Sequence, residues 1–520
     1  MTSDPYYHFG HLLLESLKER PDDICQIDAA TGEQETNLSV LKRTIRLVRY
    51  LRRLRLRPGA VAALGGANHL DIHVPLYAAL LTGMPVAALD PTYKFDEMKA
   101  SFKLTKPKIL FIDHYMYEDA SRAIQELGLD TRIITFDEGE CTLKDVLDSE
   151  EDEDVDTFQP EKFEADKVFL WLMSTSGTTG VLKYAAFDHL SILKIVLIYK
   201  KMLLVKKSDK QAIILNLSPA QWITGSFNAV LPPVLHAVKL QTSAAATVEH
   251  VIDIINRYKP TTTMISPSLA SQILKSGTPC DLSCFQHVTL TGSKVRPELL
   301  TAFRARVCNG VVAEAYGQTE TIGGCLKLEP EGPLGNCGSP SPLHQVKLVD
   351  PDTEEEITEP NKPGEMWVKG PRFVEYYNMP EETAKVFSKD GYIKTGDLLY
   401  RDENNYFYYV ERIKMLIKYK NYHVVPLELE AVIQKVAGVE AAAVTSVADP
   451  ECGELPAAVV VRAPGADVTA QQVKDAVANE LSDSKRLRGG VVFVDALPYT
   501  STGKVARAKL RELVKTGHRE

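Results

Sequence analysis

The sequence lacks several features that would assign the chain to a common class of protein. Its eight cysteines include no Cys-x-x-Cys pair, so the ligand spacing of a structural zinc site is absent. No run of about 18 uncharged apolar residues occurs, so we expect no membrane span. A formal net charge of -9 argues against a nucleic-acid-binding protein, because such proteins depend on a cationic surface.

What is present describes a folded protein of more than one domain. The chain has 520 residues, too many for one ordinary core, with 44% hydrophobic and 25% charged residues. Helix-like and strand-like segments alternate in the first half, which is typical of parallel βαβ units. A turn-rich region with short strands follows at 335–367, and a compact α+β pattern begins near residue 412. We therefore predict an α/β fold: a large N-terminal domain of βαβ subdomains with a β-subdomain, and a small C-terminal α+β domain.

Two charged clusters receive structural interpretations. Arg52, Arg53, Arg55 and Arg57 end a helix-like stretch before Pro58-Gly59, where cations favour the helix terminus, so we prefer a helix end over a phosphate site. The acidic run at 148–156 is predicted to be a solvated loop, because like charges repel one another, and it is a possible linker.

An apolar strand at 168–173 leads directly into a segment suited to holding phosphate. Its glycines let backbone amides converge on an anion, its hydroxyls add donors, and its lysine adds a charge. Lys183 has neither the preceding Gly nor the following Ser or Thr of a Walker loop, and a Ser/Gly-rich surface turn is the alternative. The candidate residues are Ser174, Thr175, Ser176, Gly177, Thr178, Thr179, Gly180 and Lys183.

This loop resembles the phosphate loop of the acyl-adenylate-forming (AMP-binding) superfamily, and the resemblance covers nearly the whole chain. That family includes acyl-CoA synthetases, 4-coumarate-CoA ligases, insect luciferases and peptide-synthetase adenylation domains. Four further segments are similar to the family's motifs and occur in the family's order. They are Glu314-Ala-Tyr-Gly-Gln-Thr-Glu-Thr, Tyr392-Ile-Lys-Thr-Gly-Asp, Lys418-Tyr-Lys-Asn-Tyr with Pro426-Leu-Glu-Leu-Glu, and Pro498-Tyr-Thr-Ser-Thr-Gly-Lys504.

The resemblance assigns roles to individual residues. It implies that Glu320 positions Mg²⁺, Thr319 contacts the α-phosphate, and Asp397 with Arg412 holds the ribose. It also implies that Lys504 is the catalytic lysine of adenylate formation. Further members of the implied site are the adenine-side residues Tyr316 and Gly317, the nucleotide-site residues Gly292 and Ser293, and the catalytic-segment residue Lys418.

The implied activity is a two-step ligase reaction that uses ATP, Mg²⁺, a carboxylic acid and coenzyme A. The N-terminal domain would span 1–411 and the mobile C-terminal domain 412–520, with a hinge at about 411–414. The acid is either a fatty acid or an aryl acid, and Gly292, Gly323 and Gly324 leave room for its tail. The expected location is the cytoplasm; the peroxisome is the family alternative, although the chain does not end in a Ser-Lys-Leu-type signal.

Four departures from the family pattern keep other functions open. Leu182 and Tyr184 flank Lys183 where Pro and Gly are usual, so a bulky ring is expected in the phosphate loop. Asn421 replaces a Gly and Glu411 replaces the hinge Asp. No His follows the strand at 213–217, and Trp222 is expected to fill that wall of the acyl pocket. The alternatives are a catalytically impaired nucleotide-binding protein, against which Lys504 argues, and luciferase-like oxidation of an adenylate.

Overall fold

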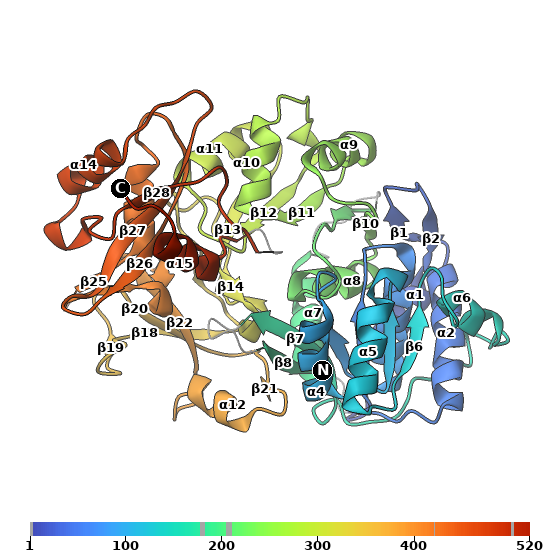
Figure 1. Cartoon of the computed structure of the whole chain (residues 1–520). Helices are drawn as coiled ribbons and strands as arrows, with labels where there is room; N and C mark the ends of the chain where they lie inside the picture. The colour runs from blue at the N-terminus through green and yellow to red at the C-terminus, as the bar shows by residue number, and fades with distance from the viewer. Residues whose placement is uncertain (1–3, 177–181, 204–210, 421, 501–503) are drawn as a thin grey trace. The chain divides into compact units, whose positions relative to one another are not determined.

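The computed structural model describes residues 4–176, 182–203, 211–420, 422–500 and 504–520. It confirms the predicted α/β fold, with helices and strands alternating along the first part of the chain (Figure 1). Two compact units form: Met1–Gln345 with Lys369–Tyr392, and Val346–Val368 with Ile393–Glu520. The β-rich region expected in the N-terminal domain thus belongs mainly to the second compact unit. The division into compact units reflects contacts within one conformation, whereas the predicted border at 411/412 is a hinge about which the C-terminal domain would rotate. That border therefore stays a prediction.

The first unit contains a seven-stranded sheet in the order β21-β8-β7-β4-β3-β5-β6. The strands β7, β4, β3, β5 and β6 are parallel, whereas β8 and β21 are antiparallel to their neighbours. The connecting segments include α3, α4 and α5, as the alternating pattern predicts. The bounds are β3 (Ala62–Gly65), α3 (His73–Thr82), β4 (Val86–Ala88), α4 (Phe95–Thr105), β5 (Ile109–Ile112), α5 (Tyr117–Leu127), β6 (Arg132–Thr135), α6 (Leu143–Asp148), β7 (Phe169–Ser176), β8 (Leu182–Asp188), α7 (His189–Leu203), β21 (Glu375–Tyr376) and α12 (Pro380–Val386).

A second seven-stranded sheet of the same unit has the order β13-β12-β11-β9-β10-β1-β2. All its pairings are parallel except that between β1 and β2. Its strands, and the helices that lie before, between and after them in sequence, are α1 (Phe9–Glu19), β1 (Ile24–Asp28), β2 (Gln34–Thr36), α2 (Asn37–Arg53), β9 (Ile213–Leu215), α8 (Ile223–Leu235), β10 (Val238–Gln241), α9 (Val248–Tyr258), β11 (Thr262–Ile265), α10 (Pro267–Lys275), β12 (His287–Thr291), α11 (Pro297–Arg306) and β13 (Val311–Ala315). Short hairpins follow: β14 (Gly317–Gln318) with β15 (Gly323–Gly324), and β16 (Leu326–Lys327) with β17 (Ser339–Pro340).

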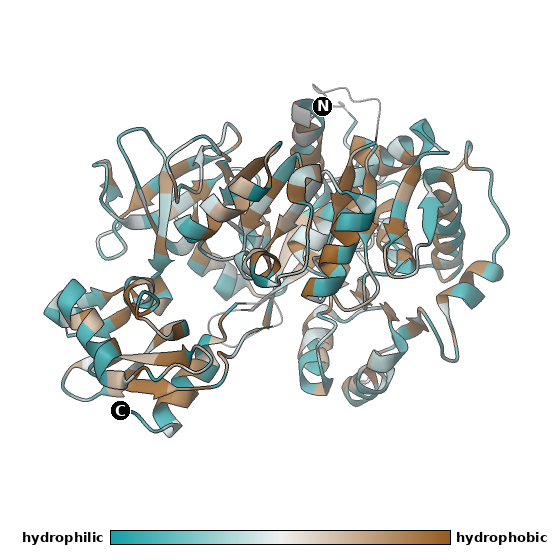
Figure 2. Ribbon diagram, turned by 90° about the horizontal axis from the view of Figure 1, so that it is seen from above, coloured by the Kyte–Doolittle hydropathy of each residue, from teal (hydrophilic) through white to brown (hydrophobic). Residues whose placement is uncertain are grey.

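The second unit holds two five-stranded sheets. One has the order β19-β18-β20-β22-β23, and in the other β25-β24-β27-β26 is extended by β28 beside β27. Alternate residues of β26 and β27 enter two separate cores, one under α13 and α14 and one under α15. Figure 2 shows these strands, near the C-terminus, as largely apolar. The bounds are β18 (Gln345–Val349), β19 (Glu356–Ile357), β20 (Gly364–Lys369), β22 (Ile393–Arg401), β23 (Phe407–Arg412), β24 (Ile417–Tyr419), β25 (Tyr422–Val424), α13 (Pro426–Ile433), β26 (Val439–Asp449), β27 (Gly453–Arg462), α14 (Ala470–Glu480), β28 (Val491–Phe493) and α15 (Arg507–Thr516).

Arginines along α2 form ion pairs with the acidic run. Arg53 pairs with Glu150 at 2.8 Å, and Arg46 pairs with Asp152 at 2.7 Å. The preference for a structural role over a phosphate site is therefore confirmed for Arg53. The solvated-loop prediction is wrong for Glu150, whose side chain is buried against the arginines of α2. Within the described ranges, every helix is too short or too polar to span a bilayer.

A lysine is buried in the centre of the second sheet. Lys239 lies on β10 and is 1% exposed, and its Nζ atom has no hydrogen-bond partner among the described residues. The ring of Tyr77 lies 5.8 Å from this Nζ. Burial lowers the pKa of Lys239 to about 7, while the neighbouring Cys25 and Glu35 favour the charged form. The lysine therefore has a stability cost, since in the unfolded chain it would be fully protonated at neutral pH.

Replacing Lys239 with Met is expected to stabilise the first unit at pH 7 by on the order of 2–4 kcal/mol. The folded-state pKa is depressed, so the wild-type penalty is full below pH 7 and disappears as the pH rises towards 10.5. Urea unfolding at pH 7 and pH 10 should give a larger gain at pH 7. Lys275→Met, at an exposed position on α10, is the control. A gain of equal size at both pH values would contradict the assignment.

Candidate functional site

The predicted phosphate loop connects two antiparallel strands of the first unit. Ser174 pairs with Tyr184 and Thr175 with Lys183 across β7 and β8, and Ser176 ends β7. Gly177, Thr178, Thr179 and Gly180 lie outside the described residues. The structure therefore shows both flanks of the loop, with Ser174, Thr175 and Lys183 on adjacent strands.

Tyr184 does not occupy the loop as expected. Its side chain is fully buried, its hydroxyl lies 2.7 Å from the Ser101 hydroxyl, and it donates to the Ala88 carbonyl at 3.0 Å. Neighbouring strand residues point to opposite faces, so Tyr184 enters the core. The bulky ring thus supports β8 from within the core.

Lys183 is held by a segment that is remote in sequence. Strand β21 pairs with β8, and α12 follows β21 directly. This arrangement places the Tyr376 ring 4.9 Å from Lys183 Nζ and forms an ion pair between Lys183 and Glu382 of α12. The expected phosphate-binding ammonium is therefore already engaged by a carboxylate.

The expected metal anchor, Glu320, also contacts the segment that contains β21. Thr319 and Glu320 lie in a short 3₁₀ turn, Thr319–Thr321. The Tyr376 hydroxyl donates to Glu320 Oε1 at 2.7 Å, and the Phe373 amide donates to the Glu320 carbonyl at 2.9 Å. Tyr376 thus contacts Glu320 through its hydroxyl and Lys183 through its ring.

Glu320 is compatible with a Mg²⁺ ion that is shared with substrate phosphates. In the described part of the chain, no group of three or more His, Cys, Asp or Glu residues could hold a metal by itself. Mg²⁺ at nucleotide sites commonly takes one or two carboxylates and completes its shell with phosphates and water. A single carboxylate beside the phosphate-loop lysine fits that donor set.

The remaining nucleotide-site candidates of this unit follow two adjacent parallel strands. Gly292 and Ser293 come after β12, and Tyr316 and Gly317 after β13. The carboxyl ends of parallel strands are a common location for ligand sites. Gly292 and Ser293 are exposed, whereas Tyr316 is buried. A Cβ atom on Gly317 would lie 2.0 Å from the Gly323 carbonyl oxygen, so this turn needs glycine.

One buried carboxylate next to these residues received no role from the sequence. Glu314 on β13 is buried, and burial raises its pKa to about 7. Its Oε1 atom accepts a hydrogen bond from the Val295 amide at 3.2 Å, and Oε2 has no partner among the described residues. Glu314 therefore anchors the loop that contains Gly292 and Ser293.

In the second unit, the structure brings three predicted residues together. Asp397 on β22 lies opposite Arg412 on β23, and Arg412 Nε is 3.0 Å from Asp397 Oδ1. Lys504 remains accessible to solvent, yet the surrounding protein desolvates its ammonium and lowers its pKa. The Arg412 charge adds to this lowering, whereas Asp397 opposes it. The two predicted ribose ligands and the predicted catalytic lysine thus share one electrostatic environment.

The hinge candidates have different surroundings. Lys418 is exposed on β24, in a different sheet from Asp397. Asn421 lies outside the described residues. Glu411 is buried, its Oε1 accepts from the Arg412 amide at 2.8 Å, and burial raises its pKa. The structure does not bring Lys418 into the cluster of Asp397, Arg412 and Lys504.

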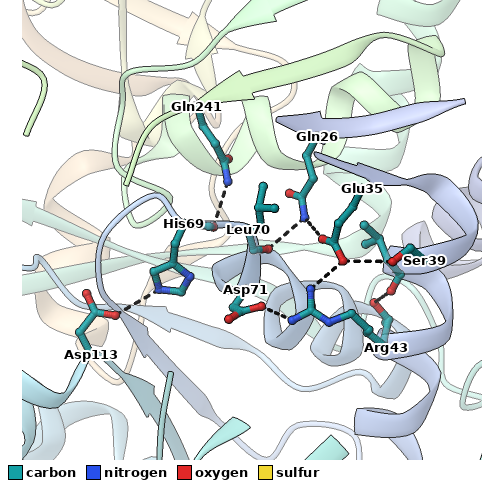
Figure 3. Close-up of polar contacts among 11 residues, drawn as sticks. Gln26, Glu35, Ser39, Arg43, His69, Leu70, Asp71, Asp113 and Gln241 are labelled. Atoms are coloured by element: carbon teal, nitrogen blue, oxygen red, sulfur yellow. Dashed lines mark hydrogen bonds and ion pairs between the residues drawn. The ribbon is translucent and has the colours of Figure 1, made fainter. Parts of the chain in front are cut away.

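The segment without the expected His is fastened by a neighbouring loop. Asn68 donates to the Ser218 carbonyl at 2.9 Å and accepts from the Ala220 amide at 3.1 Å. The next residue, His69, lies with Nε2 3.1 Å from Asp113, and Gln241 donates to its carbonyl (Figure 3). The pair of His69 and Asp113 is thus adjacent in the chain to Asn68, which contacts Ser218 although 150 residues separate Asn68 from Ser218 in sequence.

Comparisons with known proteins agree with these motifs. Residues 13–378 match the model of the AMP-binding enzyme family, and residues 428–504 match that of the AMP-binding enzyme C-terminal domain. The chain is 31% identical to luciferin 4-monooxygenase of Nipponoluciola cruciata, covering 94% of this chain and 91% of that protein. It is 29% identical to 4-coumarate-CoA ligase-like 1 of Arabidopsis thaliana, covering 96% and 93% respectively.

A solved structure has the same fold. ATP-bound MatB from Rhodopseudomonas palustris superposes with a TM-score of 0.87 at 24% identity, covering 98% of this chain and 99% of that one. The first match alone spans well over half of the chain, and the two matches include the segments at 174–183, 314–321 and 498–504, whereas those at 392–397 and 418–422 lie between the matched ranges. The chain therefore belongs to the AMP-binding, adenylate-forming enzyme family.

Proposed function

We propose that the protein uses ATP to convert a carboxylic acid into an acyl-adenylate and then transfers the acyl group to coenzyme A. The observation that supports this proposal is the ion pair between Arg412 and Asp397, the expected ribose ligand, with Lys504 within electrostatic range of both. A protein that only bound nucleotides would gain nothing from a lysine acting on the transition state.

In the first step, a carboxylate oxygen of the substrate attacks the α-phosphorus of ATP. The bond to the β-phosphate oxygen breaks, and pyrophosphate leaves. Lys504 stabilises the charge that develops on the reacting oxygens, and its lowered pKa reflects incomplete solvation of its ammonium, which strengthens such an interaction. Asp397 accepts hydrogen bonds from the ribose hydroxyls, with Arg412 as the second ribose contact.

Lys183 and Thr319 contact the phosphates, and Glu320 would hold Mg²⁺, which when bound supplies additional positive charge to them. Tyr376 orients the Glu320 carboxylate through its hydroxyl. In this proposal Tyr316 packs on the adenine.

In the second step, the thiol of coenzyme A attacks the acyl carbonyl, loses its proton, and displaces AMP. We propose that rotation near 411–414 separates Lys504 from Asp397 and brings the Lys418 segment into use. The similarity to 4-coumarate-CoA ligase-like proteins supports a thiol acceptor. Gly292 and Gly323 have open space where a Cβ would lie, which suits the tail of a fatty or aryl acid.

Oxidation of a luciferyl-adenylate is the second candidate, and the 31% identity to a luciferin 4-monooxygenase favours it. It shares the adenylation step and differs in what consumes the adenylate. Light emission from the protein with luciferin, ATP and Mg²⁺ would support it. Thioester formation that depends on coenzyme A, without light, would support the ligase.

Replacing Lys504 with Ala is expected to lower carboxylate-dependent pyrophosphate release by roughly 10²- to 10³-fold, because a stabilising charge is removed from the transition state. ATP binding should change little. A pyrophosphate assay over fatty and aryl acids, with and without coenzyme A, measures the first effect. Lys509→Ala, on the exposed face of α15, is the control. Equal rates in wild type and K504A would favour a catalytically impaired nucleotide-binding protein.

Replacing Asp397 with Asn is expected to weaken ATP binding by roughly 10- to 100-fold, since hydrogen bonds to a charged group are lost. The loss should depend on the sugar hydroxyls. Isothermal titration with ATP and with 2′,3′-dideoxy-ATP tests this, because D397N should affect the dideoxy analogue far less. An equal loss for both nucleotides would show that Asp397 acts on the fold instead of the ribose.

A further inference from the structure

The ion pair between Lys183 and Glu382 has a consequence for the phosphate site. Lys183 ends the loop that is expected to bind phosphate, and its side chain is only 11% exposed. Glu382 lies in the first turn of α12, where its side chain is 26% exposed. The carboxylate of Glu382 therefore pairs with a lysine that is largely enclosed, although Glu382 itself is partly exposed to solvent.

The charge of Glu382 is maintained over the whole physiological pH range. Hydrogen bonds from Lys183 and then from Lys385 lower the pKa of Glu382 to about 2. Lys385 contacts Oε1 and Lys183 contacts Oε2, so each carboxylate oxygen has its own ammonium partner. A phosphate oxygen approaching Lys183 would have to replace an existing anion.

The geometry also indicates which part of a nucleotide is affected. Tyr376 lies with its ring 4.9 Å from Lys183 Nζ and donates its hydroxyl to Glu320. Lys183 and the expected metal anchor are thus separated by one side chain. Lys183 directly follows the loop that is expected to hold the polyphosphate, so the Lys183–Glu382 pair concerns that part of the nucleotide.

We propose that Glu382 is an internal competitor of the ATP polyphosphate for Lys183, and that ATP must displace it to bind. The inference rests on the proposed function, since it assumes that Lys183 contacts phosphate. Glu382 thereby sets nucleotide affinity and selectivity. Its competition for Lys183 weakens the binding of the triphosphate more than the binding of ligands that place little negative charge near Lys183. Glu382 is a positioning residue that acts through Lys183.

Replacing Glu382 with Gln is expected to tighten ATP binding by roughly three- to tenfold, because a partly enclosed ion pair no longer has to break. AMP, which lacks the β- and γ-phosphates, should bind within about twofold of its wild-type affinity. Isothermal titration of the full chain with MgATP and with AMP measures both values. A purely structural role for Glu382 would weaken both nucleotides or neither, and would not separate them.

Two controls make the test specific to the Lys183 contact. Lys385→Gln removes the other partner of Glu382 and leaves its contact with Lys183, so K385Q should not tighten ATP binding. In a Lys183→Met background, the effect of E382Q should disappear, because the competing anion has lost its target. A gain that persists in K183M, or E382Q binding ATP no better than wild type, would overturn the proposal.

The failure of this inference can be distinguished from failure of the proposed function. If wild type binds MgATP and E382Q binds it equally well, only the competition is refuted. If neither wild type nor E382Q binds MgATP while both remain folded by circular dichroism, both the adenylation and the competition are refuted. Thermal unfolding of E382Q close to that of wild type confirms that α12 is intact.

Discussion

The pairing of β21 with β8 is the contact on which the candidate site of the first unit depends. The Tyr377 amide donates to the Tyr184 carbonyl, and the Val374 amide donates to the Ala186 carbonyl, each at 2.8 Å. These main-chain bonds attach residues near 375 to a strand near 185. This attachment positions Tyr376, which contacts both Lys183 and Glu320, and α12, which carries Glu382. The surroundings of Lys183 and Glu320 are therefore determined by one short edge strand.

In the second unit, strand pairing also positions the charged residues of the candidate site. An antiparallel pair places Asp397 directly opposite Arg412, and side chains opposite one another in such a pair lie close together. The Thr395 hydroxyl accepts from the Asp397 amide, and Glu365 accepts from the Gly396 amide, which fixes the turn before the carboxylate. In both units, backbone pairing sets where the charged groups lie, and their side-chain contacts depend on that placement.

The sequence predicted the parts of the structure that depend on local pattern. Alternating strands and helices, the strand before Ser174 and the α+β character of the C-terminal region could all be read from periodicity. The fates of Tyr184 and Glu382 could not. Tyr184 and its neighbour Lys183 lie on opposite faces of β8, and the motif alone does not indicate which of them faces the core. Glu382 meets Lys183 across 199 residues, and nothing in either local segment names the partner.

Similar reasoning separates the predicted site residues from one another. Asp397, Arg412 and Lys504 were grouped by resemblance, and the structure places them together because the hairpin and the C-terminal segment converge within one unit. Lys418 belongs to the same motif series, yet it lies on another sheet, and the role proposed for it depends on the proposed rotation near 411–414. Gly177, Thr178, Thr179 and Gly180 lie outside the described residues.

The tight turn at Gly317 also limits how the chain can be altered. Any side chain at this position would collide with the Gly323 carbonyl, since the two strands approach as bare backbone. Positions 292 and 323 have free space but positive φ angles of 95° and 87°, which favour glycine for a different reason. Substitution is therefore unfavourable at all three glycines, whereas Trp222 at the start of α8 has an ordinary extended backbone that accepts other side chains without strain.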